Sequence, residues 1–377
     1  AVGNYSLDAN TTGSDNSAVG HNALTANTTG ASNVAIGRGS LGFNTTASNN
    51  TAVGDLALNA NTTGTSNVAV GANALDACTT GSNNTAIGDE ALGVSTTASN
   101  NTAVGKSALI ANTTGTLNTA VGSFTLDANT TGDSNTAIGQ GSLTVATTAD
   151  NNTAVGHAAL HLATTGANNT AVGKDALRAN TTGAENVAVG ANALDANTTG
   201  GANNAFGRDA LGSNTTGNNN TAFGHATLDA ATTASNNTAV GYVALSDNTT
   251  GTKGTALGAQ ALLSATTGDD NTGIGFGALA SVTTASNNTA VGSNALVQST
   301  ASNNTAVGKD SLKLNTTGSS NVAVGRNAGT SITTGHSNVC LGVGAGQDQL
   351  TTGQDQCFIA RSNDGAGNAT VWLYGGG

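Results

Sequence analysis

The 377-residue sequence contains no proline and no methionine, and only 3% of its residues are aromatic and 8% charged. An ordinary globular chain has about 5% proline and about a quarter charged residues, so a conventional enzyme of two or three domains is not expected. Disordered segments combine low hydrophobicity with high charge. Because 37% of this chain is hydrophobic, the composition favours a folded, repeated element over disorder.

Positive charge is also scarce. The chain has ten Lys and Arg residues, none of them clustered, and a net charge of −11, so we expect no nucleic-acid partner. No apolar run approaches the roughly 20 residues of a membrane-spanning helix, and no direct membrane insertion is expected. The three cysteines (Cys78, Cys340 and Cys357) are too few for a disulfide framework and lack metal-ligand spacing.

A 17-residue repeat runs through most of the chain. The glycine that ends each Ala-Val-Gly-like triplet recurs from Gly3 to Gly292 in steps of 17, then reaches Gly308, Gly325 and Gly342. Seventeen residues are too few for a repeat of two packed helices. The length fits one coil of a parallel β-solenoid, in which two or three short strands are joined by tight turns. Thr and Val favour strands, and proline would remove a hydrogen-bond donor from each coil it entered.

The repeat therefore predicts an all-β fold: a parallel β-solenoid, or β-roll, with 17 residues per coil and about 20 coils, roughly 95 Å long at ~4.8 Å per coil. Residues 1–342 form the repeat array, and residues 343–377, where the pattern decays, are expected to form irregular C-terminal coils or a cap. Gly105 and its equivalents supply the bend between two strands.

Residues at equivalent positions in successive coils form columns, and we name each column by its residue in the coil that begins at Asn101. Thr102 and Val104 are two residues apart and share one face of a strand, which we assign to the core. The Leu109 column, which includes Leu126, is expected to fill the core from the facing strand.

Ala103 lies between these two residues and should point outward, yet its column is almost always Ala. Two explanations stay open. One is a local steric clash at the corner of the coil, and the other is a face kept small for packing against neighbouring chains. For the second, the predicted packing residues are Ala52, Ala103, Ala154, Ala205 and Ala256.

Two polar columns are predicted to form structural ladders. Stacked Asn side chains ~4.8 Å apart can hydrogen-bond along the stack, and Thr side chains at turns can satisfy backbone groups. The predicted Asn ladder contains Asn101, Asn118 and Asn135, and the Thr ladder contains Thr113 and Thr130.

No catalytic, cofactor-binding or metal-binding residue is assigned. His21, His157 and His225 share a column but lie four and eight coils apart, roughly 19 and 38 Å, which is too far for one metal site. Gly342–Gly346 lacks the Lys-Ser/Thr of a phosphate loop, and Cys340 and Cys357 fall in adjacent columns, which disfavours a disulfide.

The units Asn152–Leu160 (Asn-Thr-Ala-Val-Gly-His-Ala-Ala-Leu) and Asn197–Gly200 (Asn-Thr-Thr-Gly) resemble the head repeats of trimeric autotransporter adhesins and related bacterial and phage tail-fibre-like surface proteins. The resemblance covers residues 1 to about 342. It implies a homotrimeric β-roll on a cell or virion surface. This sequence departs from the family in its longer coil and in showing no coiled-coil stalk, membrane anchor or chaperone domain.

The expected function is that of an extracellular structural or adhesive fibre without catalysis. Its expected partner is itself, as a homotrimer or, because Ala1 begins inside a repeat, as an end-to-end filament; a host or other surface receptor is a further expected partner. The alternative is an ice-binding solenoid that uses Thr ladders, although Thr113 and Thr114 are adjacent and should point to opposite sides. A polysaccharide-processing enzyme is disfavoured because clustered carboxylates and aromatic platforms are missing.

Overall fold

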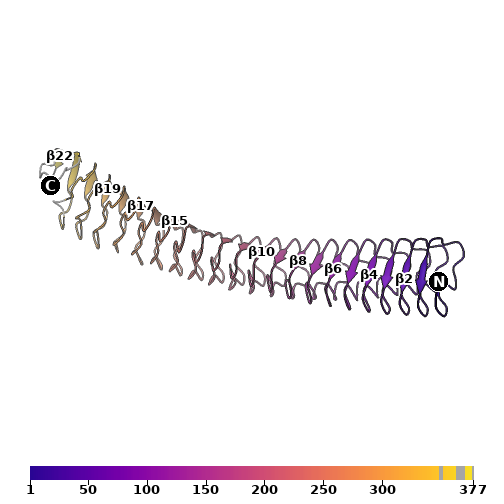
Figure 1. The fold of residues 1–377 in the computed structure, drawn as a ribbon. Helices are drawn as coiled ribbons and strands as arrows, with labels where there is room; N and C mark the ends of the chain where they lie inside the picture. The colour runs from indigo at the N-terminus through magenta and orange to yellow at the C-terminus, as the bar shows by residue number, and fades with distance from the viewer. Residues whose placement is uncertain (348–350, 362–369, 376–377) are drawn as a thin grey trace. The chain divides into compact units, whose positions relative to one another are not determined.

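The computed structural model describes residues 1–347, 351–361 and 370–375. It confirms the predicted fold class: strands stack about 17 residues apart into a β-solenoid of about 20 turns (Figure 1). The chain divides into two compact units, Ala1–Asn186 and Val187–Gly377. Among the described residues, no helix is long and apolar enough to cross a bilayer.

The first unit contains ten three-residue strands: β1 (Ser17–Val19), β2 (Val34–Ile36), β3 (Thr51–Val53), β4 (Val68–Val70), β5 (Thr85–Ile87), β6 (Thr102–Val104), β7 (Thr119–Val121), β8 (Thr136–Ile138), β9 (Thr153–Val155) and β10 (Thr170–Val172). Each pairs in parallel with the next, and equivalent residues lie opposite one another, as Ala103 lies opposite Ala120. The repeat period therefore sets the register directly.

The second unit contains β11 (Val187–Val189), β12 (Asn204–Phe206), β13 (Thr221–Phe223), β14 (Thr238–Val240), β15 (Thr255–Leu257), β16 (Thr272–Ile274), β17 (Thr289–Val291), β18 (Thr305–Val307), β19 (Val322–Val324), β20 (Val339–Leu341), β21 (Cys357–Arg361) and β22 (Thr370–Gly375). Strands β11–β21 pair in parallel, and β22 pairs antiparallel with β21. In-register pairing thus continues one strand beyond the boundary predicted at residue 342. The predicted C-terminal region falls partly on residues 348–350, 362–369 and 376–377, which lie outside the described residues.

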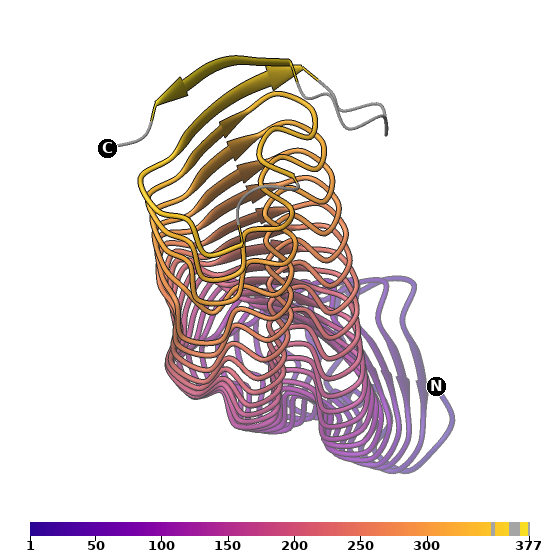
Figure 2. The same cartoon turned by 90° about the vertical axis from the view of Figure 1, so that its left-hand side faces the viewer.

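Each coil of the repeat array has one strand and returns through turns, as the end-on view shows (Figure 2). The prediction of two or three strands per coil, with Leu109 on a facing strand, is wrong. Ser107 and Leu109 adopt left-handed backbone conformations, with φ of 55° and 53°, which an extended strand does not contain. The Ser107 N–H bonds the Asp89 carbonyl of the preceding coil at 2.9 Å, and the Leu109 N–H bonds the Thr125 carbonyl of the next coil at 3.1 Å. The turns are therefore hydrogen-bonded between coils as the strands are.

Gly105 follows the strand at a position that only glycine fits. Its φ is +135°, and a Cβ added there would lie 2.4 Å from the carbonyl oxygen of Gly122 in the next coil. A side chain would be strained by the dihedral angle and would collide with backbone. This explains why the glycine recurs in every coil, as predicted for the bend.

The core consists of Leu109, Ala103 and Ala108 together with buried Asn side chains, all repeated from coil to coil. Thr102 and Val104 are only partly buried and point away from it. The predicted orientation of the strand is therefore inverted. Leu109 and Leu126 are fully buried, as expected, but they enter the core from a turn.

The predicted outward orientation of the Ala column is wrong. Ala52, Ala103, Ala154 and Ala205 are 0% exposed and Ala256 is 1% exposed within a single chain, so these residues do not form a face between chains. A glycine exception in the column, Gly273, shows the physical reason. A Cβ added there would meet Leu262 Cγ at 3.2 Å and the Ala278 carbonyl oxygen at 3.1 Å. The leucines fill the interior and leave room opposite them for a methyl group at most.

Candidate functional site

The predicted Asn ladder forms inside the solenoid. The Asn118 backbone N–H donates to Asn101 Oδ1 at 2.9 Å, and the Asn135 N–H donates to Asn118 Oδ1 at 2.9 Å. Asn101 Nδ2 donates to the carbonyl oxygen of Gly115 at 2.8 Å. Each amide thus satisfies backbone groups of two different segments while fully buried. These bonds confirm the predicted structural role of the ladder.

The Thr ladder also forms, and a second Asn ladder lies beside it. Thr113 Oγ1 donates to the Thr130 carbonyl oxygen at 3.0 Å, and Thr130 Oγ1 repeats this bond to Thr147. Asn129 Nδ2 donates to Asn112 Oδ1 at 2.9 Å. Sequence reasoning missed this second Asn ladder. The recurring Asn directly before the Thr pair was the available signal.

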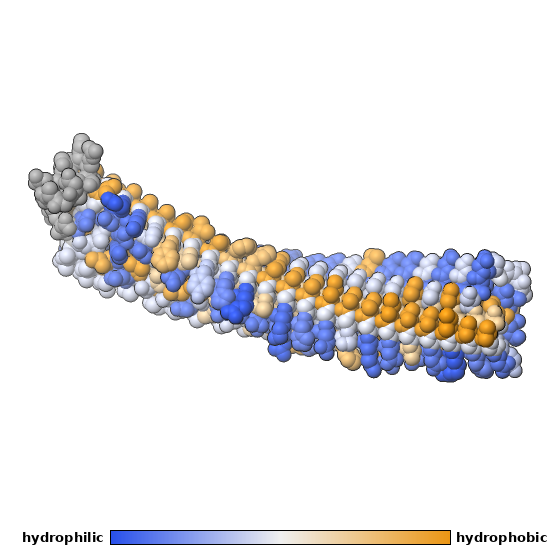
Figure 3. Space-filling view, in the orientation of Figure 1, coloured by the Kyte–Doolittle hydropathy of each residue, from blue (hydrophilic) through white to orange (hydrophobic). Residues whose placement is uncertain are grey.

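Within each unit, the Thr102 and Val104 columns of its strands (β1–β10 in the first unit, β11–β20 in the second) form a surface, which we call the outward strand face. The two columns contain Ser, Thr, Asn, Val, Ile, Leu and Phe but no charged residue. Over the coils of the first unit, hydrophobic side chains form a band bordered on both sides by hydrophilic ones (Figure 3). The sequence predicts that this face lies in the core, whereas the structure places it at the surface.

The hydroxyls of this face differ from those of the Thr113 column. Six successive strands, β5–β10, begin with Thr. The hydroxyls of these six residues form no hydrogen bond within the described part of the chain, whereas Thr113 Oγ1 is bonded to the next coil. The hydroxyls of these six Thr residues are therefore available to an external ligand, whereas that of Thr113 is not.

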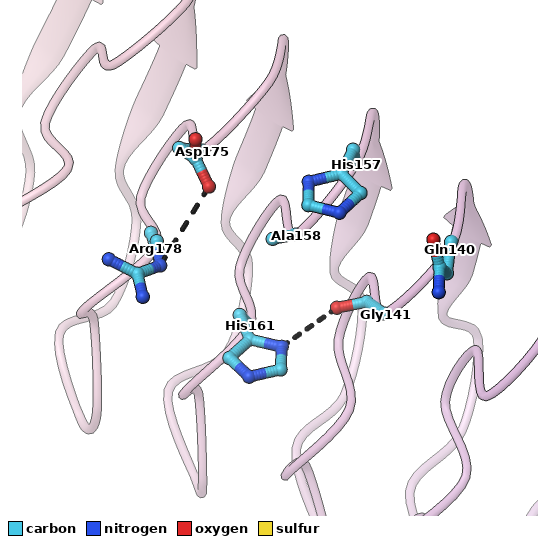
Figure 4. Close-up of a pocket in the computed structure, with 7 residues that line it drawn as sticks. All are labelled: Gln140, Gly141, His157, Ala158, His161, Asp175 and Arg178. Carbon is cyan, nitrogen blue, oxygen red and sulfur yellow. Dashed lines mark hydrogen bonds and ion pairs between the residues drawn. The ribbon is translucent and has the colours of Figure 1, made fainter.

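A groove of about 450 Å³ crosses three coils of the first unit (Figure 4). It is lined by Gln140, Gly141, His157, Ala158, His161, Asp175 and Arg178. His161 Nδ1 donates to the Gly141 carbonyl oxygen at 2.9 Å. The Asp175 carboxylate lies 2.6 Å from Lys174 Nζ and 3.7 Å from Arg178 Nε. His161 and Asp175 are thus held by partners within the chain, and the residues that line the groove include no Ser, Thr, Cys or Lys that could act as a nucleophile.

The three histidines that share a column remain apart in the structure. The ring of His21 meets Tyr5 edge-on at 6.1 Å. His225 stacks on Tyr242 with centroids 5.6 Å apart and also contacts Arg208. In the part of the chain that the structure describes, no three His, Cys, Asp or Glu side chains gather closely enough to hold a metal ion.

An aromatic pair lies on the outward strand face of the second unit. The rings of Phe206 and Phe223, on β12 and β13, have centroids 5.5 Å apart. The sequence analysis assigns the Val104 column, to which both residues belong, to the core, so it did not identify this pair, of which Phe223 is exposed and Phe206 partly buried. Alternation with period 2 is the same whichever side of a strand faces the core, so the pattern alone does not show that these two rings lie at the surface.

The cysteines occupy different environments and form no disulfide among the described residues. Burial raises the pKa of the Cys78 thiol to about 11 and that of Cys340 to about 12. Cys340 lies opposite Phe358 and Cys357 opposite Val339. The two thiols are therefore one register position apart, as predicted.

The fold and its ladders define the class of this chain: it is a parallel β-solenoid repeat protein. Comparison with protein-family models and with curated proteins finds no match.

Proposed function

We propose that this chain is a non-catalytic structural rod of an extracellular, cell-surface or virion-surface fibre, in which the coils serve as a spacer that presents an adhesive surface. The observation that carries this proposal is the continuity of the ladders. Asn101, Asn112 and Thr113 each bond an adjacent coil or a turn, and their equivalents do so in successive coils. Such nearest-neighbour stacking gives stability that grows with the number of coils.

Removal of whole coils tests this proposal. Deleting residues 102–118 joins Asn101 to Thr119 and keeps the repeat in phase, because the segment is one 17-residue unit. Deleting residues 238–254 removes an equivalent unit elsewhere. Scattering profiles should show each variant shorter by about one ~4.8 Å spacing, and the attachment of the cells or particles that carry the protein should depend on coil number rather than on coil identity.

A difference between the two deletions would contradict the spacer proposal. If one deletion abolished attachment while the other, equally well folded by circular dichroism, left it intact, the function would reside in a local site and the spacer proposal would be wrong. Protease treatment of intact cells or particles tests the location separately. A structural fibre exposed on the surface should be cleaved, whereas an internal protein should survive.

Ice binding is the second candidate, and the structure supplies a specific observation for it. Thr102 and Val104 lie side by side on the outward strand face, and the Thr hydroxyl is not bonded within the described chain. Six successive Thr rows, β5–β10, give an uncharged, regularly spaced surface. Thermal hysteresis that disappears in Thr119→Tyr but persists in Thr114→Tyr, an exposed residue of another column, would establish this candidate and refute a purely structural role.

A further inference from the structure

We propose that the outward strand face is the surface on which a second copy of this chain docks, face to face, to form a dimer. This inference rests on the proposed structural role and replaces the Ala column as the contact between chains. The Ala column is buried inside each chain, whereas the outward strand face repeats a nearly constant pair of side chains on β1–β20.

The first support is the distribution of charge. The chain has a net charge of −11, so two copies repel one another across most of their surfaces. The charged side chains lie outside the Thr102 and Val104 columns, which contain none. Two copies can therefore make close contact through this face without burying a charge, which would be costly.

The second support is the exposed apolar surface. Phe223 is 56% exposed, Leu257 48% and Ile36 42%, although all three are side chains that proteins usually bury. They belong to one column, so their exposure is a property of the face and not of isolated residues. Exposed apolar side chains that recur along one column are typical of interaction sites.

The third support is the available area. Strands ~4.8 Å apart, each three residues or ~10 Å long, give about 480 Å² for β1–β10, the same for β11–β20, and about 960 Å² when the two areas are added. A stable interface of standard size buries about 800 Å² on each partner. The face is therefore large enough to hold two copies together if both units engage.

The second unit also supplies an anchor for such a contact. The ring centroids of Phe206 and Phe223 lie 5.5 Å apart. The neighbouring strand carries the smaller, β-branched Val240 opposite Phe223. Aromatic side chains dominate the binding energy of many interfaces. A self-complementary face that meets its own copy closes as a dimer with twofold symmetry, which distinguishes this arrangement from the homotrimer implied by the sequence resemblance.

Sedimentation velocity of the full chain over a range of concentrations tests the proposal. The wild-type chain should sediment as a dimer, and the double variant Phe223→Lys/Leu257→Lys should weaken association at least about 100-fold, because each copy then places two charges in the contact. The matched control is Thr233→Lys/Thr267→Lys, which changes exposed residues of another column in the same two coils. It adds the same charge and should leave the dimer intact.

Three results would overturn the proposal: a wild-type monomer at concentrations up to about 100 µM, a trimer, or equal weakening by the two double variants. Circular dichroism identifies a variant that fails to fold, and Phe223→Ala/Leu257→Ala then serves as the milder substitution. Binding of ice or of a carbohydrate to a monomer, lost in the Lys variant of this face, would assign the surface to that ligand instead. The coil-deletion series tests the spacer role separately, so failure of the dimer leaves that result unaffected.

Discussion

Replacing Ala103 by Val tests the inverted orientation of the strands most directly. Ala103 is fully buried, and at the equivalent Gly273 even a Cβ would lie 3.1–3.2 Å from the Ala278 carbonyl oxygen and Leu262 Cγ. Two further carbon atoms therefore have no space without displacement of the leucines. Overpacking of this kind costs about 1–3 kcal/mol.

The comparison is Val104→Ala on the outward side of the same strand. Val104 is partly exposed, so its truncation should change stability by no more than about 0.5 kcal/mol. If Val104 instead faced the core, the same truncation would leave a cavity and cost about 2 kcal/mol. The two orientations thus predict opposite orders for the two variants.

Native-state hydrogen exchange is the appropriate assay, because a stack of coils can open locally without unfolding as a whole. In Ala103→Val, amides of β5–β7 should exchange roughly 5- to 150-fold faster than in the wild type, whereas strands several coils away should be unaffected. A neutral Ala103→Val variant together with a clearly destabilised Val104→Ala variant would refute the inward placement of the Ala column.

Gly105→Ala should destabilise the chain by about 2–4 kcal/mol in urea unfolding, because of its φ of +135° and the Gly122 carbonyl oxygen 2.4 Å from the added Cβ. The control is Gly93→Ala, where the backbone has no positive φ and the added Cβ would come no closer than 3.2 Å to a neighbouring atom. It should cost less than about 1 kcal/mol, and equal effects of the two variants would contradict the assignment. At mildly alkaline pH a thiol reagent should label half-buried Cys357 rapidly. It should label the buried Cys78 and Cys340, whose pKa values are raised to about 11 and 12, only after the chain unfolds. Simultaneous labelling of all three thiols would show that the interior is open to the reagent. Burial raises the pKa of Asp127 above its ordinary 3.8, and nearby His161 opposes this shift. The folded chain therefore binds this proton more tightly than the unfolded chain, and the associated stability is lost as pH rises through the folded pKa. As pH rises from the ordinary pKa of 3.8 through the raised pKa of the folded chain, the urea midpoint of the wild type should fall relative to that of Asp127→Asn, and parallel pH profiles would contradict this sign.

The repeated polar residues were the most predictable part of the molecule. Asn101 and Thr113 recur at a fixed spacing, and stacking alone brings equivalent residues within hydrogen-bonding distance. The partners of Asn101, the Asn118 N–H and the Gly115 carbonyl, depend on the path of the turn and could not be read from the spacing. The second ladder, at Asn112, follows the same regular spacing in the sequence.

The sequence by itself determined the solenoid, its period and the register of its strands, because one phase maintained over many coils allows only one way of stacking equivalent residues. It also determined that Leu109 is buried and that Gly105 bends the chain. Only the tertiary structure decided which side of each strand faces inward. Alternation with period 2 divides Thr102 and Val104 from Ala103 but assigns neither set to the core. The leucines that enter from the left-handed turn fill the interior, so the methyl of Ala103 faces them and the larger Thr and Val side chains are left at the surface.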